Sequence, residues 1–208
     1  MKTSKIHKNV IIGKNTIIED FCIIGKPAQG EADGEKMTVI GDNSIIRSHT
    51  VIYAGNVIGN NFSTGHHVVI RENNSIGDNV SVGSFSDIEH DVLIENNVRC
   101  HSRVFIPEYS EIKKNAWIGP HVVFTNAKYP KSKDVKKRLQ GPLICEGAKI
   151  GANTTLLPGV TIGKNTLIGA GSTVIKNVPD EKVFAGSPAK EIKDISEIDE
   201  YSDGKGIS

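Results

Sequence analysis

Residues 40–58 read IGDNSIIRSHTVIYAGNVI, and in this stretch an apolar residue returns at every sixth position. The register continues without a slip to residue 124, and its mostly apolar members are Ile40, Ile46, Ile52, Ile58, Thr64, Ile70, Ile76, Val82, Ile88, Ile94, Cys100, Ile106, Ile112, Ile118 and Phe124. A helix face recurs every 3.6 residues and a simple strand every 2, so a period of six with Gly, Asn and Asp in the gaps fits neither. The period predicts an all-β hexapeptide-repeat solenoid, a parallel β-helix in which each repeat supplies one short strand and one turn.

The repeat extends to both sides of this stretch and is interrupted twice. It begins at Ile6, Ile12, Ile18 and Ile24, breaks at the polar residues 26–37, and breaks again at the Lys-rich residues 127–142. It then resumes at Ile144, Ile150, Leu156, Ile162, Ile168 and Val174. Three repeats per coil and a strand spacing of about 4.8 Å predict about eight triangular coils in a prism ~38 Å tall. We expect a β-helix domain over residues 1–177 with loops at 26–37 and 127–142.

Residues 178–208 are expected to form a C-terminal extension. Two prolines end the repeat, and a short helix is expected near residues 190–201, where it would cap the open end of the solenoid with polar side chains. The last residues, 202–208, read SDGKGIS and are expected to be disordered.

Composition excludes several classes of function. The net charge of +1 gives no field that would attract nucleic acid or an acidic membrane surface. No apolar run approaches the ~18 to 20 residues of a membrane span, and the first ten residues contain no apolar signal region. We therefore expect a cytoplasmic protein without membrane insertion. The three cysteines have no metal-like or disulfide-like spacing, and Cys100 is expected to pack inward as a small hydrophobe.

Residues 18 apart occupy the same place on successive coils, so their side chains stack at ~4.8 Å. Stepping back from Asn126 by 18 reaches Glu108, then His90, then Glu72. These four residues are expected to form one polar column, each member two residues after an inward position. An imidazole flanked by carboxylates is suited to general-base chemistry, since its pKa lies near neutral pH and a carboxylate can fix its tautomer. The alternative is a polar column that only packs between subunits.

Two stretches carry a resemblance to a known family. Residues 124–132 read FTNAKYPKS and residues 185–190 read AGSPAK. The chain resembles the left-handed β-helix acyltransferases, and within them the N-acetyltransferases of nucleotide-linked amino sugars, most of all the branch that acetylates dTDP-3-amino-3,6-dideoxyhexoses. The resemblance implies left-handed coils, a homotrimer, and a cleft between subunits where acetyl-CoA and the acceptor meet. Ala127 stands where that branch has Asp, which leaves the sugar, the nucleotide (dTDP or UDP) and the amine position open.

The resemblance also implies roles for single residues. His90, Glu108 and Asn126 match the catalytic positions of the branch. His90 would take a proton from the amine or a bound water, Glu108 would orient His90, and Asn126 would hold the sugar or its amine during direct transfer in a ternary complex. Glu72 and Tyr129 are expected to help bind the acceptor. For acetyl-CoA, which is a substrate here, the matching positions are Ala152 and Ala170 along the pantetheine arm and Lys176 and Lys190 near the nucleotide end.

A second column contains His49, His67, Phe85, Arg103 and His121. His67 and Arg103 are expected to contact the nucleotide base or a neighbouring subunit, with packing of the corner as the alternative. The γ-class carbonic anhydrases share this fold but need two histidines five residues apart, and no such pair matches here, so no metal site is predicted. His7 and His101 are expected to be solvated.

The loop at residues 128–140 is either an ordinary exposed loop or a cover for the cleft whose lysines meet phosphates of CoA. Three functions remain open at this stage. They are N-acetylation of a nucleotide-linked amino sugar, O-acetylation of a sugar or small alcohol, and a non-catalytic or γ-carbonic-anhydrase-like β-helix protein. The AGSPAK ending and the absent histidine pair count against the third. An acyl group longer than acetyl is not excluded by the sequence.

Overall fold

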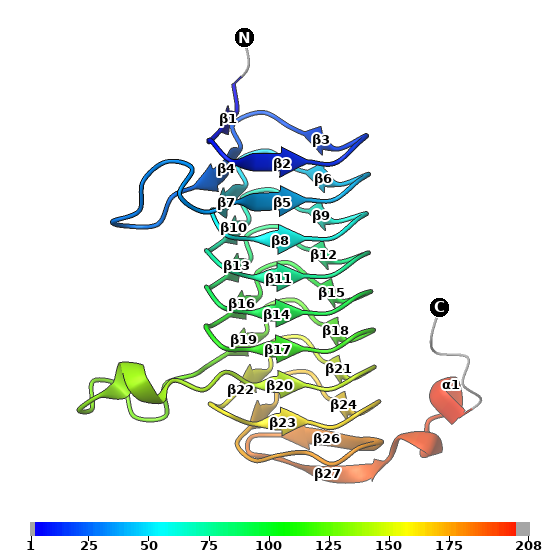
Figure 1. Ribbon diagram of the computed structural model, residues 1–208. Helices are drawn as coiled ribbons and strands as arrows, with labels where there is room; N and C mark the ends of the chain where they lie inside the picture. The colour runs from blue at the N-terminus through cyan, green and yellow to red at the C-terminus, as the bar shows by residue number, and fades with distance from the viewer. Residues whose placement is uncertain (1–2, 203–208) are drawn as a thin grey trace.

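Three sheets enclose one core in the computed structural model, which describes residues 3–202 (Figure 1). Face A is formed by β1 (Lys5–Ile6), β4 (Ile23–Lys26), β7 (Val51–Tyr53), β10 (Val69–Ile70), β13 (Asp87–Ile88), β16 (Phe105–Ile106), β19 (Val123–Phe124), β22 (Thr155–Leu156) and β25 (Thr173–Val174). Face B is formed by β2 (Val10–Ile12), β5 (Thr38–Ile40), β8 (Val57–Ile58), β11 (Ser75–Ile76), β14 (Leu93–Ile94), β17 (Glu111–Ile112), β20 (Leu143–Ile144) and β23 (Thr161–Ile162).

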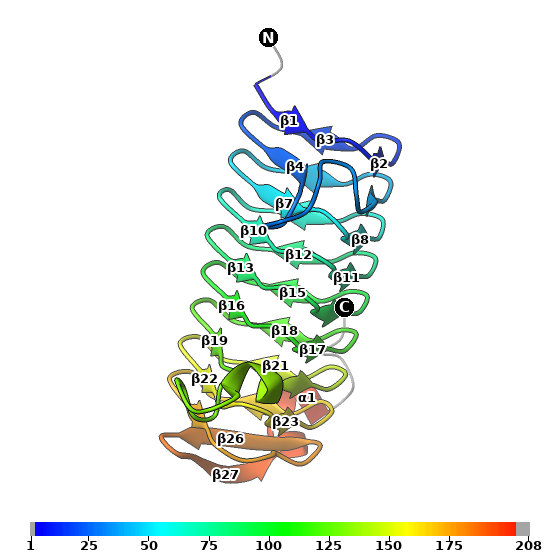
Figure 2. The ribbon, with the colours of Figure 1, turned by 60° about the vertical axis from the view of Figure 1, so that its left-hand side comes forward.

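Face C is the longest sheet and includes the C-terminal strands. It is formed by β3 (Ile17–Ile18), β6 (Ile45–Ile46), β9 (Ser63–Thr64), β12 (Ser81–Val82), β15 (Arg99–Cys100), β18 (Trp117–Ile118), β21 (Lys149–Ile150), β24 (Leu167–Ile168), β26 (Lys182–Gly186) and β27 (Ala189–Asp194). From β1 to β25 consecutive strands lie on faces A, B and C in turn, and β26 then continues face C, so the coils stack as Figure 2 shows.

Most strands contain one outward residue followed by one inward residue, which confirms the six-residue register. From Ile40 to Phe124 every inward residue of the register is at most 4% exposed. Partners in adjacent coils are 18 residues apart, as with Ile70 and Ile88. Cys100 lies among these apolar side chains, and burial raises the pKa of its thiol to about 12. It therefore packs as a hydrophobe, as predicted.

The coils turn at three corners, named here AB, BC and CA after the faces they join. The third residue after each inward position commonly has a left-handed backbone, as at Asn61 (φ 55°), His67 (φ 56°) and Asn73 (φ 62°), one at each corner. Asn tolerates this conformation better than most residues. The abundant Asn residues of the repeat are thus explained by the turns.

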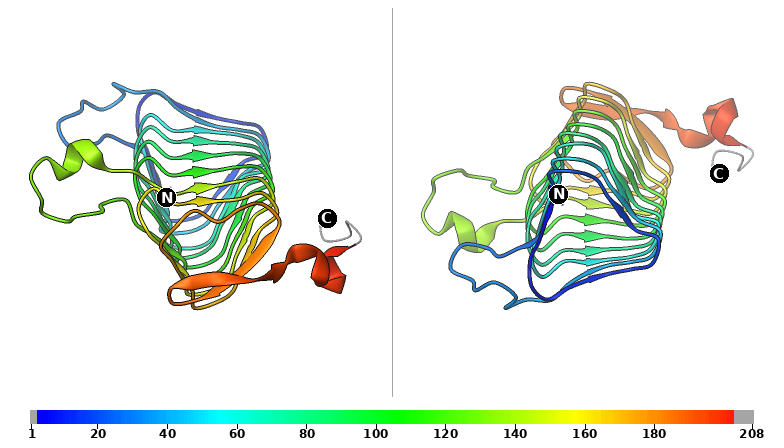
Figure 3. Two further views of the ribbon diagram at one scale, coloured as in Figure 1. Left: turned by 90° about the horizontal axis from the view of Figure 1, so that it is seen from below. Right: turned by 90° about the horizontal axis from the view of Figure 1, so that it is seen from above.

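Both predicted excursions leave the solenoid at corner AB. Residues 27–37 connect β4 to β5, and residues 125–142 connect β19 to β20 and include the 3-10 helix η1 (Val135–Arg138). Seen along the solenoid axis, the two loops project from the same side of the prism (Figure 3). His7, expected to be solvated, has a side chain only 9% exposed, and its Nδ1 lies 2.9 Å from Oδ1 of Asp33 in the first loop.

The C-terminal extension differs from the prediction of a helix near residues 190–201. β26 pairs in parallel with β24 and so continues face C, and β27 pairs antiparallel with β26. Helical structure is limited to η2 (Ile195–Glu197) and α1 (Asp199–Ser202). The physical reason is that β26 would otherwise expose an unpaired strand edge, and β27 covers that edge. Of the end predicted to be disordered, residues 203–208 lie outside the described residues.

Candidate active site at corner AB

The column predicted from 18-residue steps lies on corner AB, between the two excursion loops. Nδ2 of Asn126 donates a hydrogen bond to Oε2 of Glu108 at 2.7 Å, and Nε2 of His90 lies 3.6 Å from Oε1 of the same carboxylate. The side chains of His90 and Glu108 are 28% and 24% exposed. The structure therefore brings these three residues together at a surface that solvent reaches.

Asp91, which the sequence reasoning missed, is the carboxylate that binds the imidazole most closely. Its Oδ2 lies 2.8 Å from Nδ1 of His90. Glu108 was expected to orient His90, but its distance to Nε2 is too long for a hydrogen bond and its other oxygen is bound to Asn126. Asp91 therefore fixes a proton on Nδ1 and leaves the lone pair on Nε2, the nitrogen that faces Glu108.

Glu72, the fourth member of the column, is held by an arginine that the sequence reasoning also missed. Nε and Nη2 of Arg71 donate to its two oxygens at 2.9 and 3.0 Å. Burial is the largest single influence and would raise the pKa of Glu72, but the hydrogen bonds and charge of Arg71, a hydrogen bond from its own backbone and the nearby His90 together outweigh it, so the net shift is downward. Nη1 of Arg71 also reaches Glu89 at 3.4 Å. Glu72 is thus already paired within its own chain, so it has less capacity to bind an acceptor.

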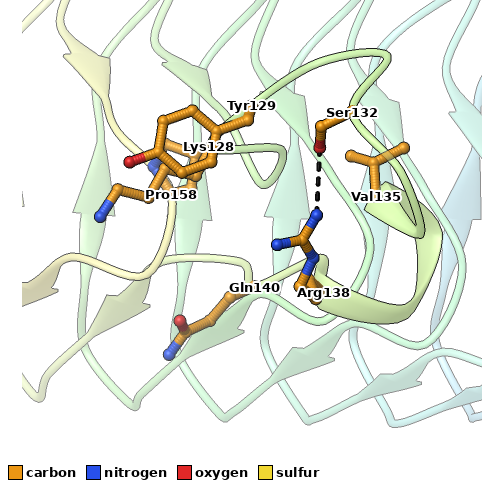
Figure 4. A pocket seen from close by; sticks show the side chains of 7 residues that line it. All are labelled: Lys128, Tyr129, Ser132, Val135, Arg138, Gln140 and Pro158. Carbon is orange, nitrogen blue, oxygen red and sulfur yellow. Dashed lines mark hydrogen bonds between the residues drawn. The ribbon is translucent and has the colours of Figure 1, made fainter.

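The second excursion loop forms a small pocket next to Asn126, with a volume of about 150 Å³ (Figure 4). The backbone N–H of Gln140 donates to the carbonyl of Asn126 at 2.9 Å, which fastens the end of the loop to the column. Tyr129 is 61% exposed, and the ammonium of Lys128 lies 5.6 Å from its ring. The pocket is lined by Lys128, Tyr129, Ser132, Val135, Arg138, Gln140 and Pro158. Its cations and hydrogen-bond donors suit an anionic ligand.

His67 and Arg103 lie on corner CA, away from the His90 column. They belong to a stack of rings in which His67 lies 4.5 Å from His49 and 5.0 Å from Phe85, and the guanidinium of Arg103 lies 5.5 Å from the ring of Phe85. The predicted column exists at this corner, and its members from His49 to Arg103 stack on one another.

The residues expected to contact CoA do not gather at one place in a single chain. Ala152 and Ala170 lie on corner CA, Lys176 follows β25 at corner AB, and Lys190 lies in β27. Ala170, Lys176 and Lys190 are exposed, and Ala152 is partly buried. They could serve one ligand only if it extended between corners or between subunits.

His101 was expected to be solvated, and this was wrong. Its ring lies 4.6 Å from that of Trp117, and its Nε2 is buried without a hydrogen-bond partner. Burial, with the nearby charge of Arg99, lowers the pKa of His101. Within residues 3–202, no three His, Cys, Asp or Glu side chains are grouped so that they could hold a metal ion.

Comparison with known proteins identifies the repeat. Residues 141–176 match the family model of the bacterial transferase hexapeptide repeat. This part of the chain carries the hexapeptide repeat of bacterial transferases. A relative of this hexapeptide protein in Saccharomyces cerevisiae, YJL218W, is named as a candidate acetyltransferase and is 35% identical over 123 residues, which are 55% of this chain. The match spans 62% of that relative's length.

Two solved structures establish the handedness of the hexapeptide fold. LpxA of Bacteroides fragilis, a UDP-N-acetylglucosamine acyltransferase, superposes with a TM-score of 0.59 at 18% identity, covering 92% of this chain and 73% of LpxA. LpxA of Acinetobacter baumannii gives a TM-score of 0.51 at 18% identity, covering 95% and 74%. The fold is therefore a left-handed parallel β-helix, which confirms the resemblance at the level of repeat and fold. No helix between residues 3 and 202 is long and apolar enough to cross a membrane.

Proposed function

We propose that the chain is an acetyl-CoA-dependent N-acetyltransferase whose acceptor is the amino group of a nucleotide-linked amino-deoxy sugar. The observation that carries this proposal is the contact chain from Asp91 through His90 to Glu108 and Asn126 at corner AB. The hexapeptide transferase repeat and the candidate acetyltransferase relative from yeast support acyl transfer as the reaction class. The FTNAKYP stretch that contains Asn126 supports the amino-sugar acceptor.

The proposed reaction is direct transfer in a ternary complex. The acceptor amine attacks the thioester carbonyl of acetyl-CoA and forms a tetrahedral intermediate. Nε2 of His90 takes a proton from the amine, directly or through a water, and Asp91 stabilises the resulting imidazolium. Collapse of the intermediate breaks the C–S bond, and the CoA sulfur leaves and takes up a proton. Asn126, held by Glu108, positions the sugar or the amine.

The loop pocket beside Asn126 is proposed to receive the diphosphate of the acceptor. Lys128 and Arg138 supply two positive charges, and Ser132 and Gln140 supply neutral donors within one loop. A guanidinium matches the geometry of a phosphate, and a charge-assisted hydrogen bond is about twice as strong as a neutral one. This placement would put the sugar close to Asn126. We propose further that the cleft is completed by a neighbouring subunit of a homotrimer, which would bring a second chain's CoA-binding residues to the column.

The experiment is a thiol-release assay with acetyl-CoA and a panel of UDP- and dTDP-linked amino sugars, with the corresponding hydroxy sugars as controls. We expect release of CoA with at least one amino sugar and none with its hydroxy counterpart. Mass spectrometry of the product should show one added acetyl group that resists hydroxylamine, as an amide does. The absence of turnover with every amine in the panel would refute the amino-sugar assignment.

O-acetylation of a sugar alcohol is a second candidate, favoured by one observation. The 2.8 Å contact between Asp91 and His90 resembles the carboxylate–imidazole pair that activates a hydroxyl group, which needs a base more than a neutral amine does. The same panel separates the two candidates, because an ester product is cleaved by hydroxylamine and an amide is not.

A further inference from the structure

A groove of about 710 Å³ lies on the outer side of face C, far along the coil from the His90 column. Its floor is a vertical row in which Trp117 pairs with Arg99 of β15 on one side and with Lys149 of β21 on the other. Amides of corner BC, from Asn79, Asn97 and Asn115, line one side, and Tyr201 of α1 lines the other. The groove thus combines an aromatic floor, two cations and a rim of amides.

Two cations line the groove, and none of its lining residues between residues 3 and 202 is acidic. Among the described residues, Arg99 forms no ion pair, so its guanidinium is available to a ligand. Nζ of Lys149 donates to the carbonyl of Gly147 at 3.0 Å and lies 4.9 Å from the ring of Tyr201. Burial lowers the pKa of Lys149, which reflects the cost of keeping this charge without a carboxylate. An anion in the groove would offset that cost.

Trp117 supplies a flat apolar surface beside these charges. Its side chain is 37% exposed although the indole packs against His101. Stacking of a nucleobase on an aromatic side chain contributes about 1–3 kcal/mol. Arg99 and Lys149 each lie one coil, ~4.8 Å, from Trp117, so a phosphate attached to a base on the indole could reach either cation. The asparagine amides on the rim could then bind the ribose or the edge of the base.

We propose that this groove binds a nucleoside phosphate, with the base against Trp117 and the phosphates at Arg99 and Lys149. The two chemical sources of such a group are a free nucleoside diphosphate and the 3′-phospho-ADP end of CoA. The groove is separate from the corner AB column within the chain, and its binding can be measured without turnover. Failure of the proposed transferase function would therefore leave this inference standing, and the reverse also holds.

Trp117 is the single tryptophan of the chain, so its fluorescence reports this groove alone. We expect a saturable change of fluorescence on titration of the full-length protein with UDP, dTDP or adenosine 3′,5′-bisphosphate, after correction for absorption by the nucleotide. Tighter binding of UDP or dTDP would indicate a nucleoside diphosphate as the ligand, and tighter binding of adenosine 3′,5′-bisphosphate would indicate the 3′-phospho-ADP end of CoA. Uridine, which lacks phosphate, and pyrophosphate, which lacks a base, should each bind at least about tenfold more weakly than UDP, because each loses one half of the recognition.

Substitutions inside and outside the groove test whether the nucleotide binds there. Arg99→Gln is expected to weaken the best nucleotide about tenfold, as loss of a charge-assisted hydrogen bond predicts. Arg47→Gln, which removes an exposed arginine paired with Glu19 at corner CA, is the matched control and should leave binding unchanged. His90→Ala should also leave it unchanged.

Calorimetry with Trp117→Ala tests the stacking without relying on fluorescence, and we expect at least a tenfold loss of affinity. The proposal is overturned if no nucleotide changes the fluorescence of Trp117. It is equally overturned if Arg99→Gln and Trp117→Ala bind like the parent protein, or if pyrophosphate binds as tightly as the best of the three nucleotides.

Discussion

Corners AB and BC have the same turn but use the second residue after the inward position in opposite ways. At corner BC this residue is a short Asp or Asn whose Oδ1 accepts a hydrogen bond from a backbone N–H of the preceding coil. The donor–acceptor pairs are Lys14–Asp42, Asp42–Asn60, Asn60–Asp78 and Asp78–Asn96, at 2.6 to 2.9 Å. At corner AB the equivalent residues are Glu72, His90, Glu108 and Asn126, and their side chains bind mainly other side chains.

At corner AB, buried asparagine amides accept the backbone hydrogen bonds of the turn, so the outward side chains are not needed for that role. Oδ1 of Asn56 accepts from the backbone N–H of Asn74, and Oδ1 of Asn74 accepts from that of Val92, at 3.0 and 2.7 Å. Asn56 and Asn74 are at most 2% exposed. The turn is therefore held from inside, and the outward position is free for titratable residues. The comparison supports placing the proposed chemistry at corner AB, where the fold does not need these side chains.

The strongest test of this comparison is His90→Ala. We expect turnover with the best amine acceptor to fall about a hundredfold, since loss of a general base commonly costs 10²–10⁴. The thermal midpoint should stay close to that of the parent protein, because no backbone group depends on the imidazole. Unchanged turnover in a folded His90→Ala protein would reduce corner AB to a second structural corner.

The next test removes the charge that orients the imidazole. Asp91→Asn keeps the size of the side chain but not the carboxylate that lies 2.8 Å from Nδ1 of His90. We expect kcat to fall about tenfold, because the imidazole loses the carboxylate that holds its ring in place and fixes the proton on Nδ1. The measurement is kcat with the best amine acceptor, with KM determined in the same experiment.

Asp91→Glu serves as the control for that change and should recover part of the rate. An unchanged kcat in Asp91→Asn would assign Asp91 to the turn alone, whose left-handed backbone (φ 56°) an Asn would also suit.

The sequence predicted most of the scaffold because its period records burial directly. Each inward residue recurs after six positions and each stacked neighbour after 18, so both the core and the His90–Glu108–Asn126 column could be read from arithmetic. The excursions were equally visible, since they interrupt that period. The C-terminal end of face C was predicted less well. β27 is stabilised by pairing with the edge of β26, and its own sequence does not show the six-residue period.

Comparing residues 18 positions apart could not predict contacts between side chains at different positions of the six-residue repeat. Asp91 follows His90 by one residue and Arg71 precedes Glu72 by one, so steps of 18 compare neither pair. Their side chains meet only because the backbone reverses at the corner, which directs neighbouring residues to the same side. The dipeptides His90-Asp91 and Arg71-Glu72 were the available signals, and adjacent opposite charges at a turn could have been tested as pairs.

The converse test is made at corner BC with Asn96→Ala. This change removes the acceptor of the Asp78 N–H at 2.9 Å, and we expect the free energy of unfolding to fall by about 1 kcal/mol. Kinetic constants should stay within experimental error because corner BC lies away from the column. Urea unfolding and steady-state kinetics check the two halves of this expectation. A drop in kcat without loss of stability would reverse the roles assigned to the two corners.

The smallest expected effect concerns Glu72, the member of the proposed catalytic corner that its own chain already pairs. Burial acts to raise the pKa of Glu72, but Arg71, a hydrogen bond from its own backbone and the nearby His90 together keep it below its ordinary value of 4.5 in the folded protein. A carboxylate with a depressed folded pKa adds stability above its unfolded pKa and loses it as the pH falls through the folded pKa. Glu72→Gln should therefore lower the free energy of unfolding by less than about 1 kcal/mol at pH 7, and by a smaller amount at pH 3. Urea unfolding at both pH values measures it, and an equal difference at the two would mean that Glu72 contributes through packing and not through its charge.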